Sequence, residues 1–158
     1  MADALTAQQT ADAVGAHMFS KDRASKAMGM RIVAISEGAA FLEMPVRDDM
    51  LNGFDICHGG FITTLADSAF AFACNSGGDV TVAAGLSVDF LVPARLGDVL
   101  TARAFEVVQA GRAGLYDITV INQRGEQVAL VRGRAHRMKG QRVLPGDKGG
   151  DGSSGATK

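Results

Sequence analysis

The stretch Cys57-His58-Gly59-Gly60, which runs directly into Phe61 to Asn75, decides the fold. The second segment has the apolar spacing of a long helix. A glycine pair at the start of a helix leaves backbone N–H groups uncovered at the positive end of the helix dipole. Because such groups can hold a developing oxyanion, we expect chemistry at the start of this helix.

This helix has one broad apolar face and one narrow face when its residues are placed at about 100° intervals. The broad face is predicted to be buried, and its members are Phe61, Ile62, Leu65, Ala66, Ala69, Phe70, Phe72 and Ala73. The narrow face holds Thr63, Thr64, Asp67 and Ala71. Asp67 is the only acid between Asp55 and Asp79. The narrow face is therefore suited to close approach by another surface rather than to solvation.

The spacing of His58 and Asp67 restricts where a shared site can form. At a rise of about 1.5 Å and a turn of about 100° per residue, the two side chains lie roughly 13 Å apart on opposite sides of the helix. They cannot converge on one substrate within a single chain. If both are catalytic, the active site lies between two subunits.

The segments before the helix predict a helical strap and a β-hairpin. Thr6 to Phe19 and Lys21 to Met28 are predicted as two short helices, with Ser20 as the N-cap between them. Met30 to Ser36 and Ala39 to Met44, the second closed by Pro45, are predicted as paired strands.

The segments after the helix predict more strands. Alternation through Val80, Val82, Ala84, Leu86, Val88 and Phe90 predicts a strand with one buried face. Further strands are predicted at Val99 to Val108, Leu115 to Asn122 and Gln127 to Arg137, forming an antiparallel meander. We expect the α+β class, with a curved sheet around the long helix. The predicted divisions are a strap at 1–28, one domain at 29–139 and a disordered tail at 140–158.

Composition excludes several classes of protein. A formal net charge of −1 without Lys or Arg runs argues against a nucleic-acid partner. Without a signal peptide or a run of about 18 apolar residues, we expect a cytoplasmic protein that does not enter a membrane. Cys57 and Cys74 are expected to be reduced and structural, and the scattered histidines give no zinc spacing. We expect neither a metal nor a cofactor.

Single residues of the region have ordinary interpretations. Asn52 alone fits a turn, because Asn-Gly favours turns, and His58 alone fits a helix cap. Asp67 alone fits either an interface hydrogen bond or a catalytic acid. Together, Asn52, the His58 to Gly60 segment and Asp67 supply a carbonyl-orienting amide, an oxyanion site and a base. These are the parts needed to split an acyl derivative with water.

The same residues carry a family resemblance. The runs Met50-Leu51-Asn52-Gly53, Cys57-His58-Gly59-Gly60 and Leu65 to Asn75 resemble the PaaI phenylacetyl-CoA thioesterases of the hotdog-fold superfamily. Val88-Asp89-Phe90-Leu91, Pro93, Gly97-Asp98, Gly114, Tyr116-Asp117-Ile118, Arg132-Gly133 and His136-Arg137 extend the resemblance over about residues 15 to 140.

The resemblance implies a fold, an assembly and roles for individual residues. It implies a hotdog fold that forms homodimers edge to edge, and homotetramers from two such dimers. Asp67 would be the general base or nucleophile, and Gly59 N–H the main oxyanion donor with help from Gly60. Asn52 and His58 would position the thioester and the water. A hydroxyl that assists in some relatives is missing at Ala71 and near Ala83, which leaves Ser68 or Thr64 as substitutes.

The implied substrate is an aryl acyl-CoA such as phenylacetyl-CoA or its ring-hydroxylated forms. Phe54, Phe61, Phe70 and Phe72 are candidates for an aromatic wall, although the last three also fit the core. Arg112 and Arg137 are candidates for the CoA phosphates, with solvated surface charges as the alternative. Two other functions remain open: a hydratase or dehydratase on the same fold, and a non-enzymatic acyl-CoA sensor.

Overall fold

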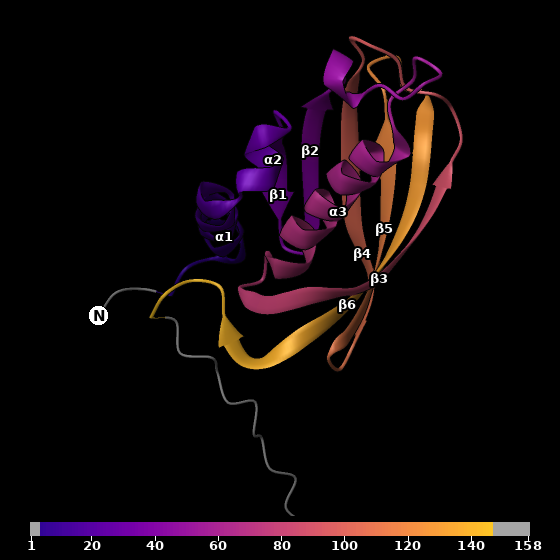
Figure 1. The fold of residues 1–158 in the computed structure, drawn as a ribbon. Helices are drawn as coiled ribbons and strands as arrows, with labels where there is room; N and C mark the ends of the chain where they lie inside the picture. The colour runs from indigo at the N-terminus through magenta and orange to yellow at the C-terminus, as the bar shows by residue number, and fades with distance from the viewer. Residues whose placement is uncertain (1–3, 147–158) are drawn as a thin grey trace, which may run out of the picture.

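The computed structural model describes residues 4–146 of the 158-residue chain. One long helix lies across the concave face of a curved antiparallel sheet, and two further helices lie beside one edge of that sheet (Figure 1). The elements are α1 (Ala7–Lys21), α2 (Arg23–Ala27), β1 (Arg31–Ser36), β2 (Ala39–Pro45), the 3-10 turn η1 (Asp48–Met50), α3 (Gly59–Asn75), β3 (Asp79–Phe90), β4 (Val99–Ala110), β5 (Ala113–Ile121) and β6 (Gln127–Arg142).

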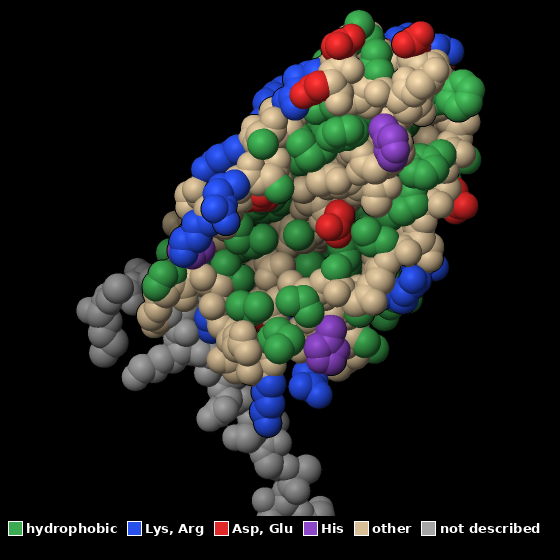
Figure 2. All heavy atoms as spheres, in the orientation of Figure 1, with side chains coloured by type: hydrophobic (Ala, Val, Ile, Leu, Met, Phe, Trp, Pro, Cys, Tyr) green, Lys and Arg blue, Asp and Glu red, His purple; other side chains and the backbone are tan. Residues whose placement is uncertain are grey.

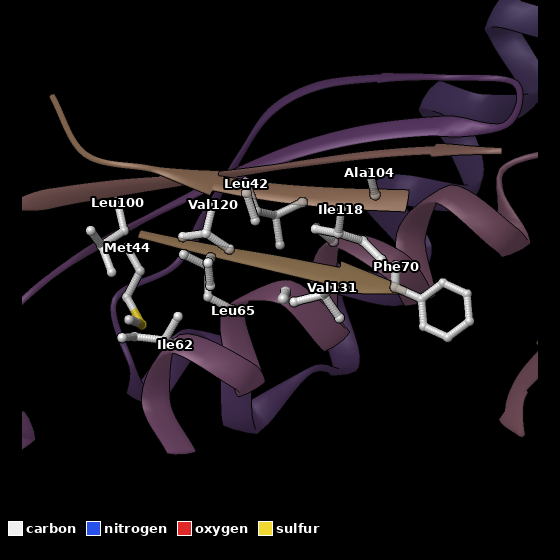
Figure 3. Close-up of a cluster of buried hydrophobic side chains, with 14 of the residues drawn as sticks. Leu42, Met44, Ile62, Leu65, Phe70, Leu100, Ala104, Ile118, Val120 and Val131 are labelled. Carbon is white, nitrogen blue, oxygen red and sulfur yellow. The ribbon is translucent and has the colours of Figure 1, made fainter. Parts of the chain in front are cut away.

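The faces of α3 are those predicted from the sequence. Ile62, Leu65, Ala66, Ala69, Phe70, Phe72 and Ala73 are buried, and Phe61 packs against this core at partial burial. Figure 3 shows Ile62, Leu65 and Phe70 of α3 among side chains that come from β2, β4, β5 and β6. The four residues of the narrow face are all partly exposed. Burial of the broad face is thus the main apolar contact between helix and sheet.

The order of strands corrects one part of the prediction. All pairings are antiparallel, but the order across the sheet is β1-β2-β4-β5-β6-β3. Only β4, β5 and β6 form a meander, because α3 carries the chain across the sheet and β3 then pairs with β6 at the far edge (Figure 1). With this correction, the arrangement is the predicted hotdog fold.

The prediction that one face of β3 is buried is also wrong in part. Val82, Ala84 and Phe90 are exposed within the chain. As an edge strand, β3 has a neighbour on one side only, and a bulge between Ala83 and Gly85 shifts the alternation of its side chains. Both effects depend on how β3 pairs with β6, and the alternation of residues within β3 alone carries no information about this pairing.

The two ends of the described chain differ from prediction in detail. Ser20 is not the cap between the first helices, because its Oγ donates to His17 O. The cap is Asp22, whose carboxylate accepts a hydrogen bond from Ser25 N–H at 2.9 Å. At the other end, β6 continues past Gly140 to Arg142, which pairs with Asp79 at 2.7 Å. Residues 147–158 of the predicted tail lie outside the described part.

Within residues 4–146, no helix is long and apolar enough to cross a membrane.

The close approach of β6 to α3 gives a test of this packing. A Cβ on Gly133 would lie 2.9 Å from three ring atoms of Phe70. Because overpacking a well-filled core costs about 1–3 kcal/mol, we expect Gly133→Ala to lower the free energy of unfolding by that amount in urea titrations. Gly53→Ala is the control, since a Cβ there meets nothing within 4 Å. Adding Phe70→Leu to Gly133→Ala should recover part of the loss, and an unchanged midpoint for Gly133→Ala would contradict the packing.

Candidate functional site

His58 is the N-cap of α3. Its backbone is extended, at φ −60° and ψ 132°, and its ring Nδ1 accepts a hydrogen bond from Gly60 N–H at 2.9 Å. An accepting Nδ1 carries no proton, so the neutral ring holds its proton on Nε2. The ring therefore presents one N–H donor, while Gly60 N–H is already used within the chain.

Gly59 N–H makes no hydrogen bond within residues 4–146. It is the first residue of α3, where an N–H has no partner inside the helix. The ring of Phe90 packs closely on this glycine, since a Cβ there would lie 2.7 Å from Phe90 Cζ. Gly59 N–H is therefore a free donor at the positive end of the helix, whereas Gly60 N–H, the second donor predicted from the sequence, is already bonded to His58.

Asn52 holds the loop that leads into the helix and keeps its amide donor. Its Oδ1 accepts hydrogen bonds from Phe54 N–H at 2.9 Å and Ile56 N–H at 3.4 Å. His58 N–H donates to Met50 O at 2.8 Å, which fixes the end of the loop. The turn interpretation of Asn52 is thus correct for its oxygen. The Nδ2 group makes no hydrogen bond in the described structure and can orient a ligand.

These residues line one cleft of about 620 Å³. Its polar side holds Asn52, His58, Gly59, Gly60 and Thr63, and its apolar side holds the run from Phe90 to Ala94. Ile56, Cys57 and Ile62 complete the lining. A mostly apolar cleft with a few convergent polar groups is the usual form of a small-molecule site.

Asp67 does not line this cleft. It lies on the partly exposed face of α3, about 12 Å along the axis from Gly59 at 1.5 Å per residue. Its carboxylate makes no hydrogen bond or ion pair within residues 4–146, and burial raises its pKa. A single chain therefore separates the candidate base from the candidate oxyanion donor, as the sequence spacing predicts.

The residues predicted to bind substrate are also outside the cleft. Phe54 is 85% exposed at its loop. Arg112 lies in the turn between β4 and β5, at the opposite end of the sheet from the start of α3 (Figure 1). Arg137 N–H donates to Arg112 O at 2.8 Å, and the Arg137 side chain pairs with Asp79 at 3.5 Å. Within one chain, none of the three reaches the cleft.

Comparisons with known proteins show the family of this chain. Residues 54–129 match the family model described as "Thioesterase superfamily". The acyl-coenzyme A thioesterase PaaI of Escherichia coli is 46% identical over 78% of this chain and 88% of its own length. The chain belongs to the thioesterase superfamily.

Solved structures resemble this chain over most of its length. The E. coli PaaI protein from the phenylacetic acid degradation operon superposes with a TM-score of 0.84 at 43% identity, covering 86% of this chain and 99% of that chain. A hypothetical thioesterase from Streptococcus pneumoniae, solved with coenzyme A, superposes with a TM-score of 0.68 at 27% identity. That match covers 72% of this chain and 90% of the other.

The two cysteines of this superfamily member are buried free thiols. Burial raises the pKa of Cys57 to about 11 and the pKa of Cys74 to about 12. Because the thiolate is the nucleophile, a thiol with such a pKa is almost wholly unreactive at neutral pH. Cys57 is therefore a structural residue, although it stands beside His58. In the described residues no group of three or more His, Cys, Asp or Glu could hold a metal ion.

The apolar side of the cleft was not predicted from the sequence. Phe90 was expected on the buried face of a strand, and the candidates for an aromatic wall were other phenylalanines. Phe70 and Phe72 are in fact fully buried. One signal was present: Phe90-Leu91-Val92-Pro93 is a continuous apolar run that breaks the alternation just before a proline. Such a run at a strand end marks a surface that something other than this sheet covers.

The electrostatics of Asp67 predict a pH-dependent stability. Because the folded state raises the pKa of this carboxyl above its unfolded value of about 3.9, its charge destabilises the fold at neutral pH. This destabilisation decreases as the pH falls through the raised pKa of the folded state, and it is absent below the pKa of Asp67 in the unfolded state. We expect Asp67→Asn to unfold at higher urea than the wild type at pH 7, with a difference that shrinks as the pH approaches 4.

Asp117→Asn is the matched control for this measurement. The Arg132 guanidinium lowers the pKa of Asp117, so the sign is opposite and removal of this charge should destabilise the fold at pH 7. If Asp67→Asn were less stable than the wild type at pH 7, the Asp67 carboxylate would stabilise the fold, which contradicts the destabilisation expected from its burial.

Proposed function

We propose that the protein is an acyl-CoA thioesterase that hydrolyses phenylacetyl-CoA, or its ring-hydroxylated forms, to the free acid and CoA. Two features of α3 support this proposal most directly. Gly59 N–H is a hydrogen-bond donor without a partner in residues 4–146 at the start of the helix, and Asp67 is a partly buried carboxylate without a partner in these residues on its narrow face. Membership of the superfamily supports it, as do a relative named as an acyl-CoA thioesterase and another solved with coenzyme A. No cofactor is needed for this chemistry.

The reaction follows from the groups of the cleft. The thioester carbonyl oxygen accepts a hydrogen bond from Gly59 N–H at the positive end of α3, which stabilises the charge that develops on this oxygen. Asn52 Nδ2 and His58 Nε2–H donate to the thioester and orient it. Attack on the carbonyl carbon gives a tetrahedral oxyanion. Its collapse breaks the carbon–sulfur bond, and CoA leaves as a thiolate that takes up a proton.

Asp67 of the partner subunit either activates the attacking water or attacks the carbonyl carbon itself. As a general base, its carboxylate takes a proton from water while the water oxygen bonds to the carbonyl carbon. As a nucleophile, it forms a mixed anhydride that water then hydrolyses. A raised pKa brings the carboxyl nearer to working pH, which favours proton transfer. Both routes need Asp67 within reach of a cleft that its own chain does not bring near.

The free edge of β3 offers a way to join two chains. No strand of residues 4–146 pairs with its outer side, and Val82 and Phe90 are exposed along it. A long apolar edge is a template for strand pairing. Antiparallel pairing of two copies about a two-fold axis would place the Phe90 end of one β3 beside the Asp79 end of the other.

That pairing would also bring the distant arginines to the cleft. Arg137 is opposite Thr81 in the β3–β6 ladder, so it marks the Asp79 end of β3. Arg112 is joined to Arg137 through its backbone. Each cleft would then have Arg112 and Arg137 of the partner subunit nearby for the CoA phosphates. Lys and Arg side chains gather along the rim of the face that carries α3 (Figure 2). We propose a homodimer of this kind, and a homotetramer formed from two such dimers.

The buried free thiols support a reducing, cytoplasmic location as part of the proposal. No described feature favours the hydratase or the sensor.

The role of Asp67 can be tested by mutation. Removing a general base or nucleophile costs at least about a hundredfold in rate, so we expect Asp67→Asn to lower kcat for CoA release by that factor. The oligomer should stay folded and keep its mass in sedimentation. Asp117→Asn, on the outer face of the sheet, should retain activity within about twofold of the wild type. Activity of Asp67→Asn near the wild-type level would refute the mechanism.

The substrate class can be tested with a panel of CoA esters. A cleft of about 620 Å³ closed by a second subunit suits a compact ring better than a long chain. We therefore expect phenylacetyl-CoA to have a higher kcat/KM than palmitoyl-CoA in a CoA-release assay. A preference for palmitoyl-CoA would remove the aryl assignment alone. Absence of CoA release from every ester would overturn the proposed function.

A further inference from the structure

Phe90 is the one phenylalanine among the described residues that line the cleft. It is 55% exposed, although it ends a strand and lies against α3. Leu91 and Val92 beside it are also exposed, at 50% and 37%. The buried phenylalanines Phe70 and Phe72 serve the core, and Phe54 does not line the cleft. Phe90 is therefore the phenylalanine of the cleft that can contact an acyl group.

The ring of Phe90 lies against Gly59 with one face. The position of a Cβ on Gly59 would be 2.7 Å from Cζ and 3.1 Å from both Cε1 and Cε2. Because the two Cε distances are equal and only slightly longer than the Cζ distance, the glycine lies over the ring face near Cζ and not beyond its tip. The opposite face and the edges of the ring are directed away from Gly59. Among the ring pairs of residues 4–146, none involves Phe90.

The chemistry of the proposed substrate fits this position. In a phenylacetyl thioester, one methylene separates the carbonyl carbon from the aryl ring. When Gly59 N–H holds the carbonyl oxygen, the aryl ring is therefore within reach of Phe90, which packs on Gly59 and lines the same cleft. Aromatic pairs prefer centroid separations of about 4.5–7 Å and contribute about 0.5–1.5 kcal/mol beyond the area they bury. A straight alkyl chain gains the buried area but not this additional term.

We propose that Phe90 is a specificity-determining residue that selects aryl over alkyl acyl groups by ring–ring contact beside the oxyanion donor. The inference rests on the proposed thioesterase function and goes beyond it, because it assigns the selection to one side chain. Phe90 takes no part in bond making. Its ring also packs against the Cα side of Gly59, and an aliphatic side chain of similar size would preserve part of this packing.

The test compares phenylacetyl-CoA with hexanoyl-CoA in the full-length protein. We expect Phe90→Leu to lower the ratio of the two kcat/KM values, aryl over alkyl, by about three- to tenfold. The value for hexanoyl-CoA should fall less than the value for phenylacetyl-CoA, because leucine keeps an apolar surface but offers no ring. Phe90→Tyr retains the ring and should keep the wild-type ratio. Phe105→Leu is the matched control, since Phe105 is 49% exposed on β4 and does not line the cleft.

The possible results separate this inference from the proposed function. An unchanged ratio in Phe90→Leu, or an equal fall in Phe105→Leu, would overturn the role of Phe90 while hydrolysis persists. If Phe90→Leu fails to fold in a thermal melt, Phe90→Met provides the same comparison. If the wild type hydrolyses neither ester, the proposed function fails. In that case, the affinities for the non-hydrolysable ketone analogues of phenylacetyl-CoA and hexanoyl-CoA, measured by calorimetry, test the role of Phe90. An equal loss of affinity for both analogues in Phe90→Leu would overturn it.

Discussion

The hydrogen bond from Gly60 N–H to the ring of His58 is the contact on which the site depends. It starts α3 at Gly59, satisfies one of the N–H groups that a helix start leaves open, and fixes the protonated nitrogen of the imidazole. Gly59 N–H remains uncovered in consequence. The buried face of α3 then holds this donor rigidly against the sheet, so the position of the donor is set by the packing of the whole domain.

A second constraint is the separation of Asp67 from that donor. A helix cannot bend back over about 12 Å, so one chain cannot bring both groups to one carbonyl. The carboxylate has no partner in the described chain, and burial raises its pKa. A protein retains a charge in such a place at a cost in stability. A catalytic role at an interface between subunits gives a physical reason for the cost.

The local elements of this fold could be predicted from the sequence. The faces of α3 follow from the spacing of its apolar residues, and the first hairpin follows from Gly38 in its turn and Pro45 at the end of its second strand. The candidate site was predictable where residues adjacent in sequence cooperate, as with Asn52, His58 and Gly59. The place of β3 was not, because which strand pairs with β6 depends on the path of α3 across the sheet.

The remaining errors have similar causes. Ser20 and Asp22 are both good helix caps, and the choice between them depends on where α1 stops packing against β1. Phe90 has the alternation of a core residue, but its strand is an edge strand with a bulge, so its ring meets the cleft instead. Arg112 and Arg137 carry the right charge for phosphates, yet their distance from the cleft is set by tertiary structure alone.

The claim that each site combines the cleft of one subunit with Asp67 of its partner can be measured by mixing two inactive variants. In a dimer formed at random from His58→Ala and Asp67→Asn chains, about half of the dimers are hybrids, and each hybrid has one intact site. We expect an equimolar mixture to regain about a quarter of the wild-type activity once mass spectrometry shows that subunits have exchanged. Activity that stays at the level of the separate variants after complete exchange would rule out a site shared between subunits.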